Sequence, residues 1–163
     1  MKATLQVINQ MQVDGVISRY AIGGAIGATF YLEPTSTFDI DVFITLENVL
    51  GSSLVSLEPI YRYLESRGYL PEKECIMIEG WLVQFLPPGD ALDEEALAQA
   101  IQADADGVPV RVMTAEHLVA IGLKVGRPKD KIRIAQFVES GILDEKKLRQ
   151  ILERHGLLAK WKQ

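Results

Sequence analysis

The segment 38–45, FDIDVFIT, places two carboxylates in a run that otherwise has the composition of a buried β-strand. Side chains on a strand alternate between its two faces, so Asp39 and Asp41 share one face while Ile40 and Val42 bury the other. The two aspartate Cα atoms are then roughly 7 Å apart along the strand. Unpaired carboxylates this close repel each other and are costly near a core, so the pattern predicts a cation between them.

A divalent hard cation suits this donor pair. Mg²⁺ binds one or two carboxylates together with water and phosphate oxygens, so we expect Mg²⁺ (or Mn²⁺) at Asp39 and Asp41. The spacing alone is weak, because Asp104 and Asp106 in ADADGV repeat it in a small, polar stretch that we predict to be a surface turn. A solvated strand edge is the alternative interpretation of Asp39 and Asp41.

Periodicity and turn residues predict strands interleaved with helices, followed by helices alone. The fold class is therefore α/β or α+β: a small mixed sheet with flanking helices and a helical C-terminal part, divided at 1–112 and 113–163. We expect strands over 19–22, 38–45, 75–78, 81–86 and 108–113, with the third and fourth forming a hairpin. Helices are expected over 5–17, 25–32, 57–67, 93–101, 116–125, 128–139 and 144–155.

Charge and cysteine content exclude several classes of protein. The formal net charge of -5 predicts no general affinity for nucleic acid or for acidic membranes. Residues 1–112 carry 6 Lys/Arg and 16 Asp/Glu, whereas 113–163 carry 11 and 6, so the halves either face each other across a cleft or are two separate solvated surfaces. One cysteine and two histidines cannot build a disulfide framework or a Cys/His zinc site. The absence of a signal-like or membrane-spanning segment predicts a cytoplasmic protein without a membrane partner.

Gly23 and Gly24 lie between a predicted strand and a predicted helix, upstream of the aspartates. Glycine lets a backbone approach a phosphate closely, and amides at a helix start attract anions. The segment GGAIGA has neither the lysine of a P-loop nor a dinucleotide-binding fingerprint. A glycine pair by itself is usually a turn, so its meaning depends on what surrounds it.

The order strand, Gly-Gly, helix, Ser/Thr-rich loop and Asp-x-Asp strand resembles the polymerase-beta-like nucleotidyltransferase superfamily. The matching residues are IGG at 22–24 and TSTFDIDVF at 35–43. The resemblance implies binding of a nucleoside triphosphate with Mg²⁺, held by Asp39 and Asp41, and transfer of a nucleotidyl group to an acceptor. It also implies phosphate contacts from Gly23 and Gly24.

The segment 110–138 resembles bacterial stand-alone members of this superfamily, including those of toxin–antitoxin and abortive-infection systems. A Leu-x-x-x-Lys helix and an Arg-x-Lys-Asp segment match here at Lys124, Arg127, Lys129 and Asp130. We expect Lys124 and Arg127 to contact the triphosphate, and Lys131 and Arg133 to be solvent-exposed. These relatives also suggest a partner protein, and the acceptor is open between RNA, protein and a small molecule.

Three features leave alternatives open. Ser36 and Thr37 either hydrogen-bond the γ-phosphate or form a Ser/Thr turn. Active members of the superfamily carry a third carboxylate on a later strand, and in WLVQFLPP the matching residue is the neutral Gln84. An amide cannot accept a proton, so either Glu79 or Glu74 substitutes, or the chain is a non-catalytic module that binds a nucleotide or a protein. A plain α/β domain with a surface aspartate pair is the remaining interpretation.

Overall fold

The computed structural model describes residues 1–37, 39–46 and 56–162. Its helices are α1 (Lys2–Val13), α2 (Gly24–Ala28), α3 (Glu58–Ser66), α4 (Ala91–Ala98), α5 (Ala115–Val125), α6 (Pro128–Ser140), α7 (Glu145–Arg154) and α8 (Leu158–Trp161). Its strands are β1 (Arg19–Ile22), β2 (Asp39–Thr45), β3 (Pro71–Glu72), β4 (Cys75–Ile78), β5 (Trp81–Leu86), β6 (Ile101–Ala105) and β7 (Val108–Val112).

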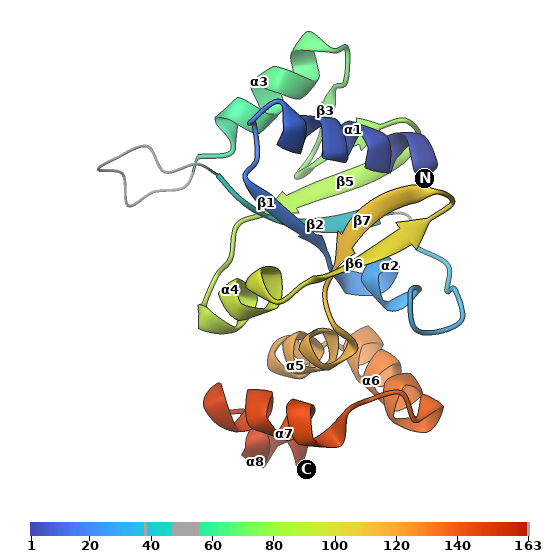
Figure 1. Ribbon diagram of the computed structural model, residues 1–163, viewed down its shortest axis with the longest axis vertical. Helices are drawn as coiled ribbons and strands as arrows, with labels where there is room; N and C mark the ends of the chain where they lie inside the picture. The colour runs from blue at the N-terminus through green and yellow to red at the C-terminus, as the bar shows by residue number, and fades with distance from the viewer. Residues whose placement is uncertain (38, 47–55, 163) are drawn as a thin grey trace.

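The strands form one mixed sheet in the order β3-β4-β5-β2-β1-β7-β6. Strand β2 pairs antiparallel with β1 and parallel with β5, while β1 also pairs parallel with β7. Helices α1 and α3 lie on one side of the sheet and α4 to α8 on the other (Figure 1). The predicted class, a mixed sheet with flanking helices and a helical C-terminal part, is therefore confirmed.

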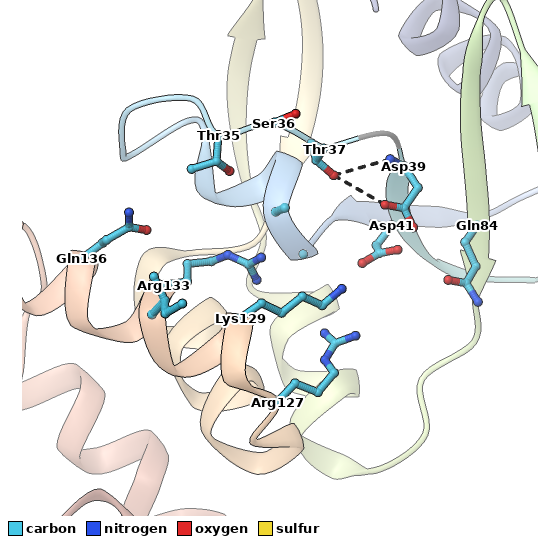
Figure 2. A pocket seen from close by; sticks show the side chains of 13 residues that line it. Thr35, Ser36, Thr37, Asp39, Asp41, Gln84, Arg127, Lys129, Arg133 and Gln136 are labelled. Atoms are coloured by element: carbon cyan, nitrogen blue, oxygen red, sulfur yellow. Dashed lines mark hydrogen bonds between the residues drawn. The ribbon is translucent and has the colours of Figure 1, made fainter.

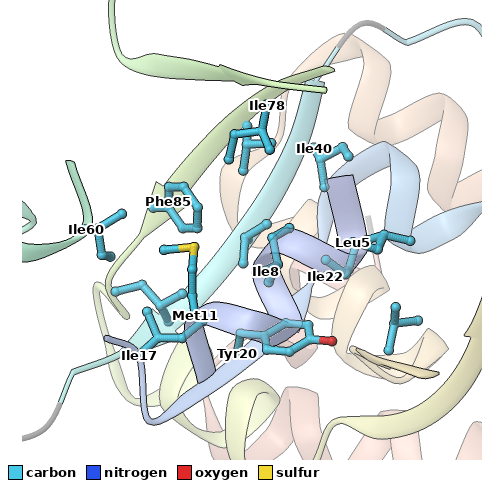
Figure 3. Close-up of a cluster of buried hydrophobic side chains, with 14 of the residues drawn as sticks. Leu5, Ile8, Met11, Ile17, Tyr20, Ile22, Ile40, Ile60, Ile78 and Phe85 are labelled. Carbon is cyan, nitrogen blue, oxygen red and sulfur yellow. The ribbon is translucent and has the colours of Figure 1, made fainter. Parts of the chain in front are cut away.

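One hydrophobic core fills the space between the sheet and its α1/α3 side. The helical spacing of Leu5, Ile8 and Met11 puts all three on the buried face of α1. They pack with strand side chains that point to the same side, among them Ile40 and Phe85 (Figure 3). Every second residue of β2 is thereby committed to this core, which leaves Asp39 and Asp41 on the opposite face.

A second core lies between the sheet and the C-terminal helices. Its buried residues include Ala21 of β1, Leu97 of α4, Phe137 of α6 and Leu152 of α7. Small side chains on the sheet, such as Ala21, let these helices approach closely. This core draws on both sides of the predicted boundary at 112/113, so that division stays a prediction.

Most predicted elements are confirmed, and some differ from the prediction in their bounds. The strand over 19–22 and the hairpin of β4 and β5 have the predicted bounds. The helix predicted over 25–32 ends at Ala28. The helix predicted over 93–101 begins at Ala91 and ends at Ala98, and Ile101 instead opens β6. Phe38, predicted to begin the strand over 38–45, lies outside the described residues.

The surface turn predicted for ADADGV is wrong in part. Asp104 belongs to β6, which pairs antiparallel with β7, and only Asp106 and Gly107 form the turn, both with positive φ. Strand β6 is at the edge of the sheet, where one-sided pairing and exposed side chains tolerate polar residues. Its sequence therefore lacks the apolar alternation by which a strand is recognised.

Candidate functional site

Asp39 and Asp41 lie side by side on the open face of β2. Asp39 is exposed and Asp41 half-buried, while Ile40 and Val42 between and beyond them are fully buried on the other face. The backbone amide of Gly23 donates a hydrogen bond of 2.9 Å to the carbonyl oxygen of Asp41. The end of β1 is therefore fixed against the carboxylate-bearing part of β2.

Gly24, the first residue of α2, is in direct contact with the Asp41 carboxylate. A Cβ atom built on Gly24 would lie 2.3 Å from Asp41 Oδ2, and the backbone there has a φ of +58°. Both the space and the conformation require glycine at this position. A Cβ on Gly23 would lie 2.9 Å from the ring of Phe43, so the pair lets α2 start directly beside β2.

The carboxylates open into a cavity of about 470 Å³ between the sheet and α6 (Figure 2). Its walls come from β2, β5, α2, α6 and the loop that precedes β2. The lining residues are Gly24, Ala25, Thr35, Ser36, Thr37, Asp39, Asp41, Gln84, Arg127, Lys129, Ile132, Arg133 and Gln136. Of the eight predicted site residues, six line the cavity: Gly24, Ser36, Thr37, Asp39, Asp41 and Arg127. A seventh, Gly23, adjoins it.

Helix α6 gives the cavity a cationic wall. Arg127, Lys129 and Arg133 point toward the carboxylates from this helix (Figure 2). Buried Asp130 holds Arg127 in place, accepting from its Nε at 2.7 Å and from its Nη2 at 3.2 Å. The same carboxylate accepts from the Arg127 backbone amide at 3.2 Å, which closes the first turn of α6. A planar guanidinium fixed in this way is arranged to bind an oxyanion.

Neighbouring charges of both signs change the pKa of Asp41. Burial raises the pKa of Asp41, and the neighbouring negative charge of Asp39 raises it further. Arg127, Lys129 and Arg133 act in the opposite direction without cancelling the effect. The site therefore favours an added positive charge next to Asp41.

Gln84 occupies the position beside the aspartates where a third carboxylate was expected. In the parallel pairing of β2 with β5 it lies directly opposite Asp41, and its side chain lines the cavity. Neither proposed substitute is present there. Glu79 lies in the β4–β5 turn and accepts a hydrogen bond of 2.6 Å from the Tyr69 hydroxyl. Glu74 precedes β4 and is likewise absent from the described lining.

Lys124, predicted to contact phosphate, has another place in the structure. Its ammonium group donates to Asp90 Oδ2 at 2.9 Å and to Asp93 Oδ1 at 2.8 Å. Burial lowers the pKa of Lys124, but these two partners outweigh it and the pKa is raised. Asp90 is the N-cap of α4, so Lys124 joins α5 to the start of α4 and does not line the cavity.

The loop before β2 keeps both interpretations of its hydroxyl groups open. The Thr37 hydroxyl oxygen lies 3.5 Å from Asp39 Oδ1 and 3.5 Å from the Asp39 backbone nitrogen, at the limit of a hydrogen bond. This is the geometry of a loose Ser/Thr turn. Ser36 and Thr37 both line the cavity, so contact with a bound phosphate is also compatible with their position.

Sequence reasoning missed part of the cationic wall. Arg133 was expected to be exposed on the surface, but its side chain is 19% exposed and lines the cavity with Lys129 and Gln136. These three residues follow helical spacing at i, i+4 and i+7, so they share one face of α6. This spacing is visible in the sequence and shows that the three side chains share one face of α6. It does not show which part of the protein that face lies against.

The donor set is compatible with Mg²⁺ but does not form a complete cage. Among the described residues no group of three or more Asp, Glu, His or Cys side chains converges on one point. Mg²⁺ usually takes one or two protein carboxylates and completes its shell with water and phosphate oxygens. Asp39 and Asp41 therefore fit a divalent cation that arrives with a phosphorylated ligand.

Solved structures identify this arrangement of strands and helices. An antigenic nucleotidyltransferase-like protein from Paracoccidioides brasiliensis superimposes with a TM-score of 0.66 at 12% identity, over 97% of this chain and 90% of that one. This chain has the fold of the nucleotidyltransferase superfamily.

The nucleotidyltransferase fold extends over the C-terminal helices as well. The antibiotic-resistance factor ANT(2'')-Ia matches with a TM-score of 0.57 at 16% identity, covering 99% of this chain and 93% of that one. At this level of identity the likeness concerns the fold. No family model and no curated protein sequence matches the chain. Within the described residues no helix has the length and apolar character needed to cross a bilayer.

Proposed function

We propose that the protein is a metal-dependent nucleotidyltransferase that moves a nucleoside monophosphate from a nucleoside triphosphate to an acceptor. The observation that supports this most strongly is the cavity in which Asp39 and Asp41 face the cations of α6, on a nucleotidyltransferase fold. Carboxylates suit the metal and cations suit the phosphates, and a triphosphate needs both at once.

Each wall of the cavity has a role in the proposed reaction. Asp39 and Asp41 hold Mg²⁺ or Mn²⁺, which when bound with the triphosphate neutralises charge that builds up on the phosphates. Gly23 and Gly24 leave space for phosphate oxygens beside Asp41, and Ser36 and Thr37 donate hydrogen bonds to them. Arg127 and Lys129 stabilise the departing pyrophosphate as a fixed guanidinium and a mobile point charge.

Calorimetric titration with Mg²⁺ and ATP tests the proposal. Asp39→Asn and Asp41→Asn are each expected to weaken Mg²⁺-dependent ATP binding by about 10- to 100-fold, because the metal loses a charged ligand. Asp106→Asn is the matched control: it removes an exposed aspartate at a turn with positive φ, which asparagine tolerates. Absence of Mg²⁺-dependent triphosphate binding in the unmodified protein would refute the proposal.

A pair of lysine variants tests the cationic wall. Lys129→Met is expected to weaken ATP binding by about tenfold, since it removes a cation that faces the phosphates. Lys124→Met is expected to leave ATP affinity unchanged and to lower stability, because Lys124 is paired with Asp90 and Asp93. The reverse result would restore Lys124 as the phosphate ligand. Binding without transfer to any acceptor would favour the non-catalytic module that Gln84 suggests.

A further inference from the structure

A second cavity, of about 310 Å³, lies at the opposite end of β1 from the candidate site. Its lining residues are Gln12 of α1, Arg19 and Tyr20 of β1, Leu97 and Ala98 of α4, and Arg111 of β7. None of these six residues lines the cavity of Asp39 and Asp41. The two cavities therefore use different side chains, although β1 leads from one to the other.

Arg19 and Arg111 come from neighbouring strands and share one face of the sheet. Their strand neighbours Tyr20, Ile22, Val110 and Val112 all belong to the core on the α1/α3 side. Because side chains alternate along a strand, the two arginines point to the other side, on which α4 lies (Figure 1). The last residues of α4 complete the wall of the cavity there.

A buried tyrosine fixes the backbone that carries Arg111. The Tyr20 hydroxyl donates to Asn9 Oδ1 at 2.6 Å and accepts from the Arg111 backbone amide at 3.3 Å. The arginine side chains differ in exposure, since Arg111 is half-buried and Arg19 is exposed. One guanidinium thus starts from a fixed position inside the cavity, and the other can approach from its rim.

Neither arginine has an acidic partner among the described residues. Five of the eight arginines form an ion pair with a carboxylate: Arg62, Arg67, Arg127, Arg133 and Arg154. Arg19 and Arg111 form none in the part of the chain that the structure describes, and no Asp or Glu is among the lining residues given above. Residues 1–112 carry 16 Asp/Glu and 6 Lys/Arg, so two of the six cations meet at one cavity of an acidic region.

The end of α4 does not take the place of an acidic partner. A helix C-terminus attracts cations through its unpaired carbonyl groups, and α4 ends at Ala98 beside this cavity. Within the described residues, however, neither guanidinium donates a hydrogen bond to these carbonyl groups. Two like charges at one cavity repel each other, and each guanidinium has five N–H donors to satisfy. An anion between Arg19 and Arg111 would meet both requirements.

We propose that this cavity binds the phosphate group of a small molecule between Arg19 and Arg111. The planar guanidinium fork matches phosphate oxygens, and two forks from neighbouring strands bind one phosphate from two sides. The cavity is at the lower end of the range for ligand pockets, about 300 to 1,000 Å³. Its occupant is therefore inorganic phosphate or a small phosphate ester whose organic part lies against Leu97 and Gln12. The acidic surroundings oppose a polyanion such as RNA.

Calorimetric titration with inorganic phosphate, in Mg²⁺-free buffer of constant ionic strength, tests the proposal. Arg19→Gln and Arg111→Gln are each expected to weaken phosphate binding at least about tenfold, because each removes a charge-assisted contact. Arg149→Gln is the matched control: Arg149 also lacks an ion pair among the described residues, but it lies on α7 and does not line this cavity. No phosphate binding by the native protein, or equal binding by Arg111→Gln and Arg149→Gln, would overturn the inference.

The cations of α6 are a competing site for phosphate, so Lys129→Met is titrated as well. It is expected to retain the phosphate binding that Arg111→Gln loses. The reverse result would assign the phosphate to the candidate site and overturn the inference. Because the two cavities use different side chains, failure of this test leaves the proposed function unaffected, and loss of ATP binding leaves the phosphate site unaffected.

Further probes identify the source of the phosphate group. Ribose 5-phosphate and inorganic phosphate are expected to compete for the site, and ribose is expected not to bind. Tighter binding of ribose 5-phosphate would indicate an ester, and tighter binding of inorganic phosphate would indicate the free ion. Tighter, Arg111-dependent binding of oligouridylate would overturn the proposal of a small ligand.

Conservative variants separate a phosphate contact from a loss of folding. Arg19→Lys and Arg111→Lys keep the charge but lose the fork, so each is expected to bind phosphate several-fold more weakly than the native protein. Circular dichroism checks that every variant is folded. Native phosphate affinity in both folded lysine variants would contradict a two-arginine fork.

Discussion

At the scale of single residues, the tightest contact of the site joins Gly24 to Asp41. We expect Gly24→Ala to cost more stability than Gly15→Ala, although both residues have positive φ. Alanine at Gly15 meets nothing within 4 Å and incurs only the conformational penalty, about 1 to 2 kcal/mol. Alanine at Gly24 must also displace the Asp41 carboxylate, adding about 1 kcal/mol or more. Urea unfolding of both variants measures the difference, and equal losses would contradict it.

Gln84 gives a second prediction at this scale. Gln84→Glu adds a carboxylate directly opposite Asp41 on the neighbouring strand. Without metal the added repulsion is expected to lower stability, and with Mg²⁺ and ATP the variant is expected to bind the metal several-fold more tightly. Gln136→Glu makes the same change on α6 in the same cavity and serves as the control. Magnesium titrations that do not distinguish the two variants would argue against a metal site beside Gln84.

The sequence was informative about residues whose environment is local. Asp39 and Asp41 could be placed on one face because strand alternation is a property of the chain alone. Gly24 could be recognised as unusual, but its contact with Asp41 depends on the packing of α2 against β2. The positions of the Lys124 and Arg133 side chains could not be predicted from local sequence. Which cation faces the cavity depends on how α5 and α6 pack on the sheet, and no local pattern contains that packing.

At the scale of elements, Glu95 connects three helices. Its carboxylate, on α4, accepts from Arg154 Nε of α7 at 2.6 Å, from His117 Nε2 of α5 at 2.9 Å and from His155 Nε2 at 3.2 Å. The Thr114 hydroxyl, 2.7 Å from His117 Nδ1, satisfies the other ring nitrogen. His117 is fully buried within α5, and His155 is the C-cap of α7.

This cluster predicts how stability depends on pH. Burial opposes ionisation of Glu95, but hydrogen bonds from Arg154, His117 and His155 outweigh it and lower the pKa to about 2. Since the folded pKa is below the ordinary value of 4.5, Glu95 stabilises the protein above pH 4.5, and this contribution is lost as the pH falls toward 2. We expect the unfolding free energies of the native protein and Glu95→Gln to differ by about 2 kcal/mol at pH 6 and to converge by pH 2.

Thermal or urea unfolding at several pH values provides the measurement. Glu94→Gln is a suitable control, because Glu94 is an exposed neighbour on the same helix. A difference between Glu95→Gln and the native protein that stays constant from pH 6 to pH 2 would contradict the proposed role of the cluster.

Elements with strong apolar periodicity were predictable, and weakly patterned ones were not. Strand β1 and the β4–β5 hairpin have apolar residues that commit them to the core, and a Gly that fixes the turn. Strands β3 and β6 at the sheet edges, and the four-residue helix α8, carry little apolar pattern. These elements form because a neighbouring strand or helix packs against them, and the sequence does not show which segment that neighbour is.

At the scale of the whole molecule, the second core makes the two halves of the chain depend on each other. Removal of residues 113–163 would expose Ala21 and Leu97, and would remove Phe137 and Leu152 from beneath the sheet. Each large side chain contributes about 1.5 to 3 kcal/mol when buried. We therefore expect the fragment 1–112 to lack a cooperative unfolding transition, which thermal melting followed by circular dichroism can test.

A shorter truncation supplies the comparison. Removal of residues 158–163 takes away α8, whose residues are half-buried or exposed, so a cooperative transition is expected to remain. A fragment 1–112 that melts cooperatively would show instead that the N-terminal part is an independent domain, as the division at 112/113 predicts.

The second core also has a consequence for the synthesis of the protein. A growing chain emerges from the ribosome with its N-terminus first, so the sheet face around Ala21 is made long before Phe137 and Leu152, which cover it. The α1/α3 side has its own covering helices early, whereas α5, α6 and α7 on the aspartate-bearing side come after the whole sheet in the chain. The nascent chain therefore has an interval in which α4 alone of the helices on this side has been made and part of this face is open to chaperones or to aggregation. The candidate site is complete only once α6 has been made.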